Sequence, residues 1–317
     1  MQAILNALRA AGEPTRLRIL SVLSSGELTV TELTYILRQS QPRISRHLKL
    51  LADAGLIERH PEASWVFYRL VQARGFMEFL GQLLDALPSD DPTLMGDLAR
   101  LTHVRRERTD RADAYFSANA VDWEDIRSRH LPEKDIEASI SKLLPKKTFG
   151  NLVDLGTGTG RMLELFGSLA HKATGFDLNP DMLTLARSRL QTLGYANCFV
   201  QQGDATQIPF ANEEADVVII HQVLHFLDNP AMAIGEAARI LAPNGKLVVV
   251  DFAPHDMENL REEHAHRRLG FEAKEVQGWM VDVGLTPETI ENLGDDQDKS
   301  NLTVSIWSGS KRKRNTK

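Results

Sequence analysis

Residues 153–166 read VDLGTGTGRMLELF, and this stretch decides the fold of the larger part of the chain. An apolar run that contains Asp154 leads into three glycines within five residues, and a helix-like pattern follows. A glycine-rich turn between a strand and a helix lets the backbone approach a ligand closely, because glycine has no side chain to obstruct it. The pattern therefore predicts a ligand-binding turn after the first strand of an α/β domain.

Strand-like and helix-like segments alternate from residue 150 onward. The strand-like segments NLVDLG, KATGFD, NCFVQQGD, DVVIIHQVL and NGKLVVVDFAP are separated by helical patterns such as PDMLTLARSRLQTLG and NPAMAIGEAARIL. The runs DVVII and KLVVV are apolar on both faces, as in a buried parallel sheet. The alternation predicts a doubly wound, Rossmann-like α/β fold with its ligand at the carboxyl ends of the strands.

Acidic residues follow the next two predicted strands. Asp177 lies 23 residues after Asp154, where a carboxylate accepts hydrogen bonds from ribose hydroxyls. Asp204 follows the third strand and suits an adenine amino group. The glycines form G-x-G-x-G rather than the dinucleotide pattern G-x-G-x-x-G, which disfavours a nicotinamide cofactor.

The segments VDLGTGTG, GFDLNPDML, QGDATQIPF, DVVIIHQVLHFLDNP and ILAPNGKL together resemble class I S-adenosylmethionine-dependent methyltransferases, over about residues 110–310. The resemblance implies S-adenosyl-L-methionine or S-adenosyl-L-homocysteine as ligand. It places the amino-acid part against the glycine turn, the ribose on Asp177, the adenine on Asp204 and Ala205, and the sulfonium near His221 and Gln222. The implied binding residues are Asp154, Gly156, Thr157, Gly158, Asp177, Asp204, Ala205, His221 and Gln222.

The residues of this domain leave open whether it is an active enzyme. HQVL stands where some N-methyltransferases have N-P-P-Y, and the single cysteine, Cys198, disfavours thiol-dependent chemistry. His221 and His225 are the candidate general bases, and a structural role suits each of them equally. Tyr115 and Trp123 are candidates for a lid or for simple packing.

The first 75 residues show a different pattern of short helices and a hairpin. Helical periodicity begins at Pro14, a second helix is capped by Thr29 or Thr31, and a third spans about 41–55 with Ile44 on its inner face. The segments LIERH and WVFYRL are strand-like and are joined by PEAS. This order predicts an α+β winged helix-turn-helix domain.

The outward face of the third helix carries hydrogen-bond donors and no acid, namely Gln41, Arg43, Ser45, Arg46, His47 and Lys49. Such a helix suits phosphates and base edges in a major groove. Arg59 and Arg69 are predicted to flank the tip of the wing. Residues 1–75 have a net charge of +4 and the remainder −10, so we expect only this part to approach double-stranded DNA.

Residues 5–85 resemble the ArsR/SmtB family of bacterial repressors, most specifically in SQPRISRHLKLLADAGL. The resemblance implies a homodimer on operator DNA. Its best-known metal site uses ELCVCEL, whereas this chain reads ELTVTEL with Thr29 and Thr31, so we expect no metal site there. His264 and His266 fall in REEHAHRRLG, which is predicted as a charged surface helix on which they cannot share a metal.

The predicted organisation is a winged-helix domain at 1–88, a helical linker or dimer region at 89–120 and a methyltransferase-like domain at 121–317. No apolar run reaches about 18 residues, so no membrane span is expected. The N-terminal segment lacks a signal-peptide pattern, and one cysteine permits no internal disulfide. A cytoplasmic protein is expected.

Two functions fit these patterns. The first is a transcriptional regulator whose second domain senses S-adenosylmethionine or S-adenosylhomocysteine. The second is an active small-molecule methyltransferase whose DNA-binding domain regulates its own gene or pathway.

Overall fold

The computed structural model describes residues 2–62, 65–71, 74–119, 133–294 and 302–312. It forms two compact units, Met1–Arg111 and Ala112–Lys317, which are described separately below. Within the described ranges, no helix is both long enough and apolar enough to cross a membrane.

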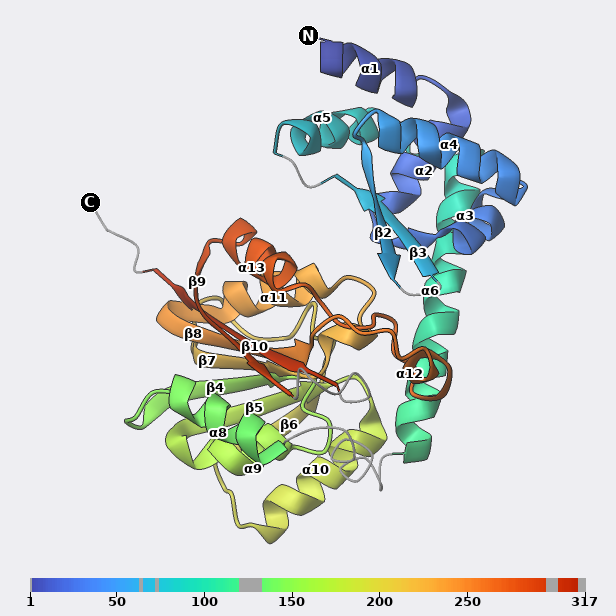
Figure 1. Cartoon of the computed structure of the whole chain (residues 1–317). Helices are drawn as coiled ribbons and strands as arrows, with labels where there is room; N and C mark the ends of the chain where they lie inside the picture. Colours follow the sequence, from blue (N-terminus) through green and yellow to red (C-terminus); the bar gives the residue numbers. More distant parts are fainter. Residues whose placement is uncertain (1, 63–64, 72–73, 120–132, 295–301, 313–317) are drawn as a thin grey trace. The chain divides into compact units, whose positions relative to one another are not determined.

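Unit 1 is a helix-turn-helix region followed by a hairpin (Figure 1). Its elements are α1 (Gln2–Ala11), α2 (Pro14–Leu23), β1 (Leu28–Thr29), α3 (Val30–Leu37), α4 (Gln41–Asp53), β2 (Ile57–Glu62), β3 (Trp65–Leu70), α5 (Arg74–Asp85) and the first part of α6 (Pro92–Asn119). The strands described in this unit pair antiparallel in the order β1-β3-β2. The predicted helix order and the two-stranded wing are confirmed.

Local sequence explains where these helices begin and end. Pro14 occupies the first turn of α2, where its missing N–H is not needed. Thr29 caps α3 in a capping box, in which its side chain accepts the Glu32 N–H and the Glu32 carboxylate accepts the Thr29 N–H at 2.8 Å. Gly55 follows α4 with φ +70°, a conformation that favours glycine.

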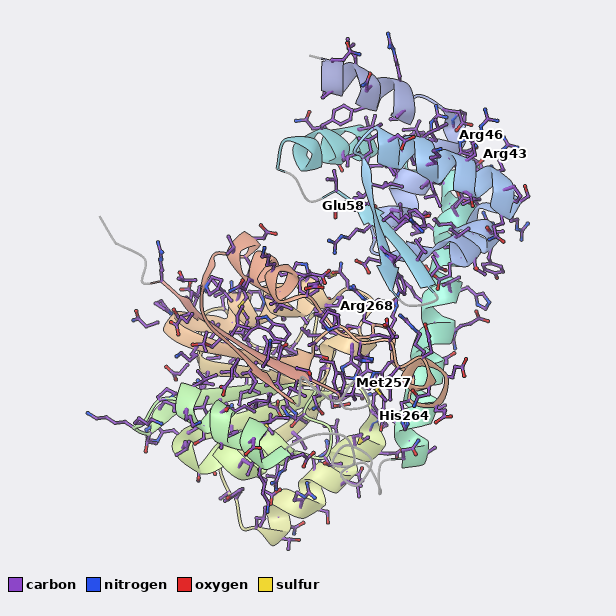
Figure 2. The ribbon with its side chains drawn as sticks, viewed as in Figure 1. Arg43, Arg46, Glu58, Met257, His264 and Arg268 are labelled. Carbon is purple, nitrogen blue, oxygen red and sulfur yellow. The ribbon has the colours of Figure 1, made fainter. Side chains whose placement is uncertain are left out.

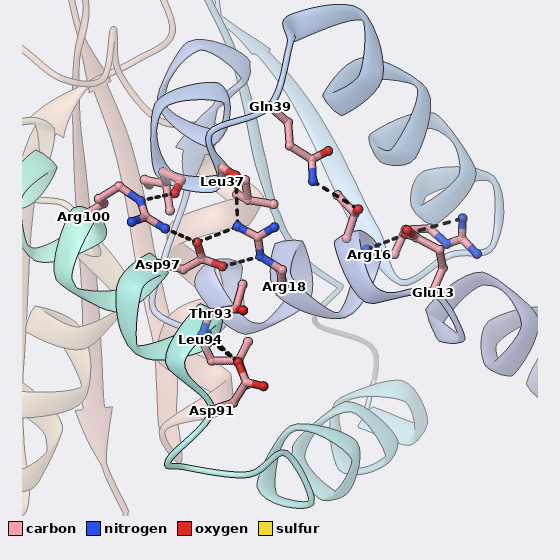
Figure 3. A network of polar contacts seen from close by, with 12 residues as sticks. Glu13, Arg16, Arg18, Leu37, Gln39, Asp91, Thr93, Leu94, Asp97 and Arg100 are labelled. Atoms are coloured by element: carbon pink, nitrogen blue, oxygen red, sulfur yellow. Dashed lines mark hydrogen bonds and ion pairs between the residues drawn. The ribbon is translucent and has the colours of Figure 1, made fainter.

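Helix α6 is fastened to the helix-turn-helix region through the buried carboxylate of Asp97, which is 1% exposed. Arg18 of α2 donates to both Asp97 oxygens at 2.6 and 2.7 Å, and Arg100 donates to one of them at 2.6 Å (Figure 3). The two guanidinium groups also donate to the carbonyls of Leu37 and Ile36 at the end of α3. Asp97 thus joins α2, α3 and α6.

Unit 2 contains the alternating strands and helices (Figure 1). Its elements after the end of α6 are α8 (Glu133–Leu143), β4 (Phe149–Leu155), α9 (Arg161–Phe166), η1 (Gly167–Leu169), β5 (Ala170–Asp177), α10 (Pro180–Thr192), β6 (Cys198–Gln202), β7 (Ala215–His221), η2 (Leu224–Phe226), α11 (Pro230–Ile240), β8 (Leu241–Phe252), α12 (Asn259–Glu263), α13 (Ala273–Asp282), β9 (Leu285–Leu293) and β10 (Val304–Lys311).

These strands form one sheet, which among the described residues has seven strands in the order β6-β5-β4-β7-β8-β10-β9. The pairs from β6 to β8 are parallel, and β10 runs antiparallel to both neighbours. One face packs against α11 and α13 and the other against α8, α9 and α10. Alternate residues of β7 enter opposite cores, Val218 one and Val217 the other, which explains its unbroken apolar run. The doubly wound fold is confirmed.

We expect Asp97→Ala to lower the local unfolding free energy of α2, α3 and the first half of α6 by about 3–5 kcal/mol. The substitution leaves two guanidinium groups without their buried anion. Hydrogen exchange of the full chain, read peptide by peptide, measures this change.

The control is Asp110→Ala, which removes a partner 68% exposed from the Arg106–Asp110 pair at 3.8 Å. It should cost less than about 1 kcal/mol. Equal protection in the two variants would contradict the importance given to Asp97.

Candidate functional site

The sheet order brings the predicted ligand-binding loops to one edge. β4 lies between β5 and β7, and all three run parallel, so the loops after them leave the sheet side by side. The loop after β4 holds the glycine turn, Asp177 ends β5, and His221 ends β7. β6 lies beyond β5, and Asp204 follows it.

The glycine turn is held by hydrogen bonds and by a close contact. The N–H groups of Gly156 and Thr157 both donate to the Phe176 carbonyl, at 2.7 and 2.9 Å. Gly156 has φ +77°, and a Cβ at this position would collide with the side chain of Val223 in the loop after β7. Only glycine combines that conformation with that approach. The turn after β4 and the loop after β7 are therefore in direct contact.

The carboxylate of Asp177 is fixed at the end of β5. One oxygen accepts the Gly158 N–H at 2.8 Å and the other accepts the Asn179 N–H at 2.9 Å. Asn179 in turn caps α10 and donates from its amide to the hydroxyl of Ser117, at 3.1 Å, near the end of α6.

Two further members of the predicted site lie buried under the turn. Asp154 is 1% exposed on β4, and Thr157 is 6% exposed. The Thr157 hydroxyl oxygen has no hydrogen-bond partner among the described residues. A buried hydroxyl without a partner beside a glycine turn and a fixed carboxylate fits a ligand with several polar groups, such as an S-adenosyl nucleoside.

The remaining predicted ligand residues differ in exposure. Asp204 is exposed and accepts both the N–H and the hydroxyl of Thr206, at 2.8 and 2.7 Å, whereas Ala205 is buried. His221 is partly exposed, and Gln222 is buried with φ +55°. That left-handed conformation is unusual for glutamine and is typical of functional loops. Trp123 lies outside the described residues, and so does the side chain of Tyr115.

His225 lies within the loop after β7, in η2, and is 2% exposed. Its Nδ1 is 2.8 Å from a carboxylate oxygen of Asp251, which is fully buried near the end of β8. Asp251 also accepts the backbone N–H groups of His225 and Phe252. A carboxylate in this position holds the proton of the neutral imidazole on Nδ1, so that Nε2 is the proton acceptor.

The prediction of a charged surface helix at 261–270 is wrong. Helix α12 ends at Glu263, and Ala265 takes φ +56°, which turns the chain inward. As a result, the ring of His266 stands 4.1 Å from that of His225, centroid to centroid. Together with His255 they form what we call the histidine cluster (His225, Asp251, His255 and His266). Sequence spacing gave no signal for it.

Two atoms of the histidine cluster are buried without a hydrogen-bond partner among the described residues, Nε2 of His255 and Nδ1 of His266. The Nδ1 of His255 accepts the Met257 N–H at 3.2 Å, so the proton of this neutral ring belongs on Nε2. Burial lowers the pKa of His255 to about 4 and also lowers the pKa of His266 well below its usual value. Both rings are therefore neutral near pH 7.

In unit 1, helix α4 exposes most of its predicted DNA-contacting residues. Those exposed are Gln41, Arg43, Ser45, Arg46 and Lys49, and Figure 2 labels the two arginines. His47 differs, because its ring is 12% exposed and its Nδ1 lies 3.5 Å from a carboxylate oxygen of Glu13. Burial lowers the pKa of His47, which makes it a poor cationic contact for phosphate.

The prediction that Arg59 and Arg69 flank the wing tip is also wrong, because Arg59 pairs with Tyr68, three pairs back from the last described pair of the hairpin. Arg69 pairs with Glu58 in the strand register, at the far end of the hairpin from residues 63–64. It contacts the carboxylates of Glu58 and Glu27 at 3.1 and 3.3 Å, whereas Arg59 is exposed. Within the described ranges, no group of three or more His, Cys, Asp or Glu is arranged to hold a metal ion.

Comparison with known proteins agrees with this architecture. Residues 13–59 match the family described as bacterial regulatory protein, arsR family, and residues 153–249 match the family described as methyltransferase domain. The chain joins an ArsR-type helix-turn-helix region to a domain with the class I methyltransferase fold.

Among curated proteins, the chain is similar to a demethylmenaquinone methyltransferase of Thermus thermophilus. The two are 35% identical over 105 residues, which are 32% of this chain and 47% of the relative. The chain spans about half the length of the curated relatives that it matches.

Solved structures with the same fold include a methyltransferase and a cyclase. A chain of the complex between the Haloferax volcanii Trm112 methyltransferase activator and its methyltransferase partner has a TM-score of 0.51 at 19% identity, covering 62% of this chain and 98% of that chain. The [4+2]-cyclase SpnF has a TM-score of 0.50 at 16% identity, covering 56% and 80%. The fold therefore accommodates more than one chemistry.

We expect acid to destabilise unit 2 through the histidine cluster. A histidine in the unfolded chain titrates near pH 6.5, whereas the folded pKa of His255 is about 4. The unfolded state binds protons that the folded state does not, so stability is highest above about pH 6.5 and falls as the pH decreases toward 4. Melting temperatures between pH 7.5 and pH 4.5 measure this fall.

His255→Gln should flatten that decline, and His171→Gln, which changes an exposed histidine on β5, should leave it as in the unaltered chain. The same pH dependence in all three proteins would contradict the role given to His255.

Proposed function

We propose that this protein is a DNA-binding transcriptional regulator whose second unit binds S-adenosylmethionine or S-adenosylhomocysteine and passes that signal to its DNA affinity. The observation that carries the proposal is the joining of two sites in one chain. Helix α4 exposes two arginines and a lysine beside two neutral donors. Unit 2 offers the glycine turn and the fixed Asp177 carboxylate.

The properties of the nucleoside site fit the ligand. Asp177 holds a fixed carboxylate for a ribose, and Gly156 leaves room for the backbone to approach the ligand. The match to a methyltransferase domain supports the same class of ligand. Thr29 caps α3 instead of providing a thiolate, which favours a signal from unit 2 over one from a metal.

Helix α6 is the element that we propose couples the two sites. Its first half binds the helix-turn-helix region through Asp97 in unit 1. Its last turns belong to unit 2, where Ser117 accepts a hydrogen bond from Asn179 and Phe116 packs on Phe226 with ring centroids 4.7 Å apart. The backbone N–H of Asn179 donates to Asp177 and its side-chain amide donates to Ser117, so a ligand on that carboxylate acts two hydrogen bonds away from the helix.

A methyltransferase is the second candidate. The His225–Asp251 pair favours it, because a sensor has no need of a base. A homodimer on DNA and a cytoplasmic location complete the proposal for either candidate.

We expect Arg43→Ala and Arg46→Ala to weaken binding to a duplex selected from a random library by the unaltered protein. Each change should cost about 1–3 kcal/mol if the arginine reads a base, and should relax the preferred sequence there. If it contacts only phosphate, the salt dependence should fall instead. Fluorescence anisotropy at several salt concentrations measures both effects.

Arg106→Ala, which changes an 80% exposed arginine on α6, is the matched control and should bind DNA normally. Full binding by an Arg43→Ala, Arg46→Ala double variant would show that α4 is not the recognition helix.

We expect nucleoside and DNA to change each other's affinity by the same factor, about 5–150-fold for a coupling of 1–3 kcal/mol. Calorimetric titration of each nucleoside, with and without the selected duplex, measures that factor. Asp177→Ala should weaken nucleoside binding about 10–100-fold, because a charged hydrogen-bond acceptor contributes about 1.5–3 kcal/mol.

Asp177→Ala should keep its DNA affinity when no nucleoside is present, which separates a lost ligand from a lost fold. Equal nucleoside affinities with and without DNA would refute the proposal that unit 2 acts as a sensor.

A further inference from the structure

The histidine cluster lies next to the proposed nucleoside site. His225 follows β7 and Asp251 lies near the end of β8, and these strands neighbour each other in the sheet. β7 also neighbours β4, whose glycine turn touches Val223, two residues before His225. The segment after β8, in which Figure 2 labels Met257, His264 and Arg268, contributes His255 and His266 to the cluster.

The pair His225–Asp251 has the geometry of a general base with its supporting acid. Asp251 holds Nδ1–H at 2.8 Å and would stabilise the imidazolium that forms when Nε2 takes a proton. The His225 ring is fixed by Phe226 at 4.0 Å and by Phe252 at 5.0 Å, measured between ring centroids. The backbone carbonyl of His225 also accepts the N–H groups of Arg267 and Arg268, which fixes the position of the residue.

The cluster also offers unused hydrogen-bonding groups. Nε2–H of His255 is a buried donor, and Nδ1 of His266 is buried as well, each without a partner among the described residues. Leaving such a group unpaired destabilises the folded protein. Folded proteins tolerate that cost where a ligand supplies the missing partner.

We propose that His225 is the general base for methyl transfer to a hydroxyl-bearing acceptor, which His255 and His266 hold by hydrogen bonds. This inference rests on the proposed S-adenosylmethionine site. The acceptor oxygen forms the new bond to the methyl carbon as the carbon–sulfur bond breaks, and the sulfonium becomes a neutral thioether. The hydroxyl proton passes to Nε2 of His225 and leaves the imidazolium beside the Asp251 carboxylate.

The surroundings favour a hydroxyl over a thiol or an amine. A thiol, with an ordinary pKa near 8.5, needs little help to ionise, whereas a phenolic hydroxyl, near 10, needs a base. An amine arrives as an ammonium ion, and the same burial that lowers the pKa of His255 and of His266 disfavours a positive charge here. A neutral hydroxyl avoids that penalty.

The test uses the full chain, S-adenosylmethionine and catechol, a compact probe with one hydroxyl to receive the methyl group and one to bind the cluster. Methyl transfer is followed by mass spectrometry from pH 6 to 9, and S-adenosylmethionine affinity by calorimetry. We expect His225→Gln to reduce kcat about 10²–10⁴-fold with nucleoside affinity unchanged. His255→Gln should raise KM for catechol with little change in kcat, and His171→Gln should match the unaltered protein.

A measurement on the unaltered chain keeps the test independent of any variant's folding. Nitrogen-15 spectra of labelled histidine should show His225 with its proton on Nδ1, and catechol should shift the His255 and His266 resonances. The proposal would be overturned by the opposite tautomer of His225 or by unshifted His255 and His266 resonances in the presence of catechol. It would also be overturned by full activity in His225→Gln, or by nucleoside binding without any methyl transfer to catechol. If the unaltered protein did not bind the nucleoside, the proposed function on which this inference rests would be refuted instead.

Discussion

The carbonyl of Phe176 organises the candidate nucleoside site. It accepts two N–H groups from the turn after β4, and it belongs to the strand that ends at Asp177 one residue later. Those two bonds therefore tie the glycine turn to the carboxylate that we assign to the ribose. Gly158 then donates to that carboxylate directly, so the carboxylate and the glycine turn are held as one piece. A substitution with a Cβ at Gly156 would push this piece away from the loop after β7.

The loop after β7 links the candidate nucleoside site and the histidine cluster. Val223 packs against Gly156 on one side, and His225 is held by Asp251 on the other. Asp251 is fully buried yet accepts three hydrogen bonds, two from backbone N–H groups and one from the imidazole, which is what a buried carboxylate requires. Breaking this arrangement would disturb both β7 and β8. The His225–Asp251 pair can therefore stabilise the fold and also serve in catalysis. The two roles differ only in whether His225 takes a proton from a substrate.

Sequence patterns predicted the elements well and the long-range contacts poorly. The apolar run of β7 and the glycine turn are local signals, so periodicity and glycine spacing were enough for both. Arg69 shows an avoidable error, since counting back from the hairpin loop places it opposite Glu58. His266 shows an unavoidable one, because the chain turns at Ala265 without a glycine and brings together histidines about 40 residues apart. The contact between His47 and Glu13 was not predicted, because helical spacing within α4 does not show where the neighbouring helix α2 begins.

The fold by itself leaves the chemistry of unit 2 undecided, since a cyclase shares it with methyltransferases. The evidence on that chemistry comes from the polar groups that are buried without a hydrogen-bond partner among the described residues. A domain that only sensed a nucleoside would need hydrogen bonds to that nucleoside, a role that we propose for the glycine turn and Asp177. The unpaired nitrogens of His255 and His266 are additional, and they cost stability unless something binds them. A second ligand beside the nucleoside explains that cost, and a regulator that responds to two ligands at adjoining sites would report on the methyl donor and on its acceptor together.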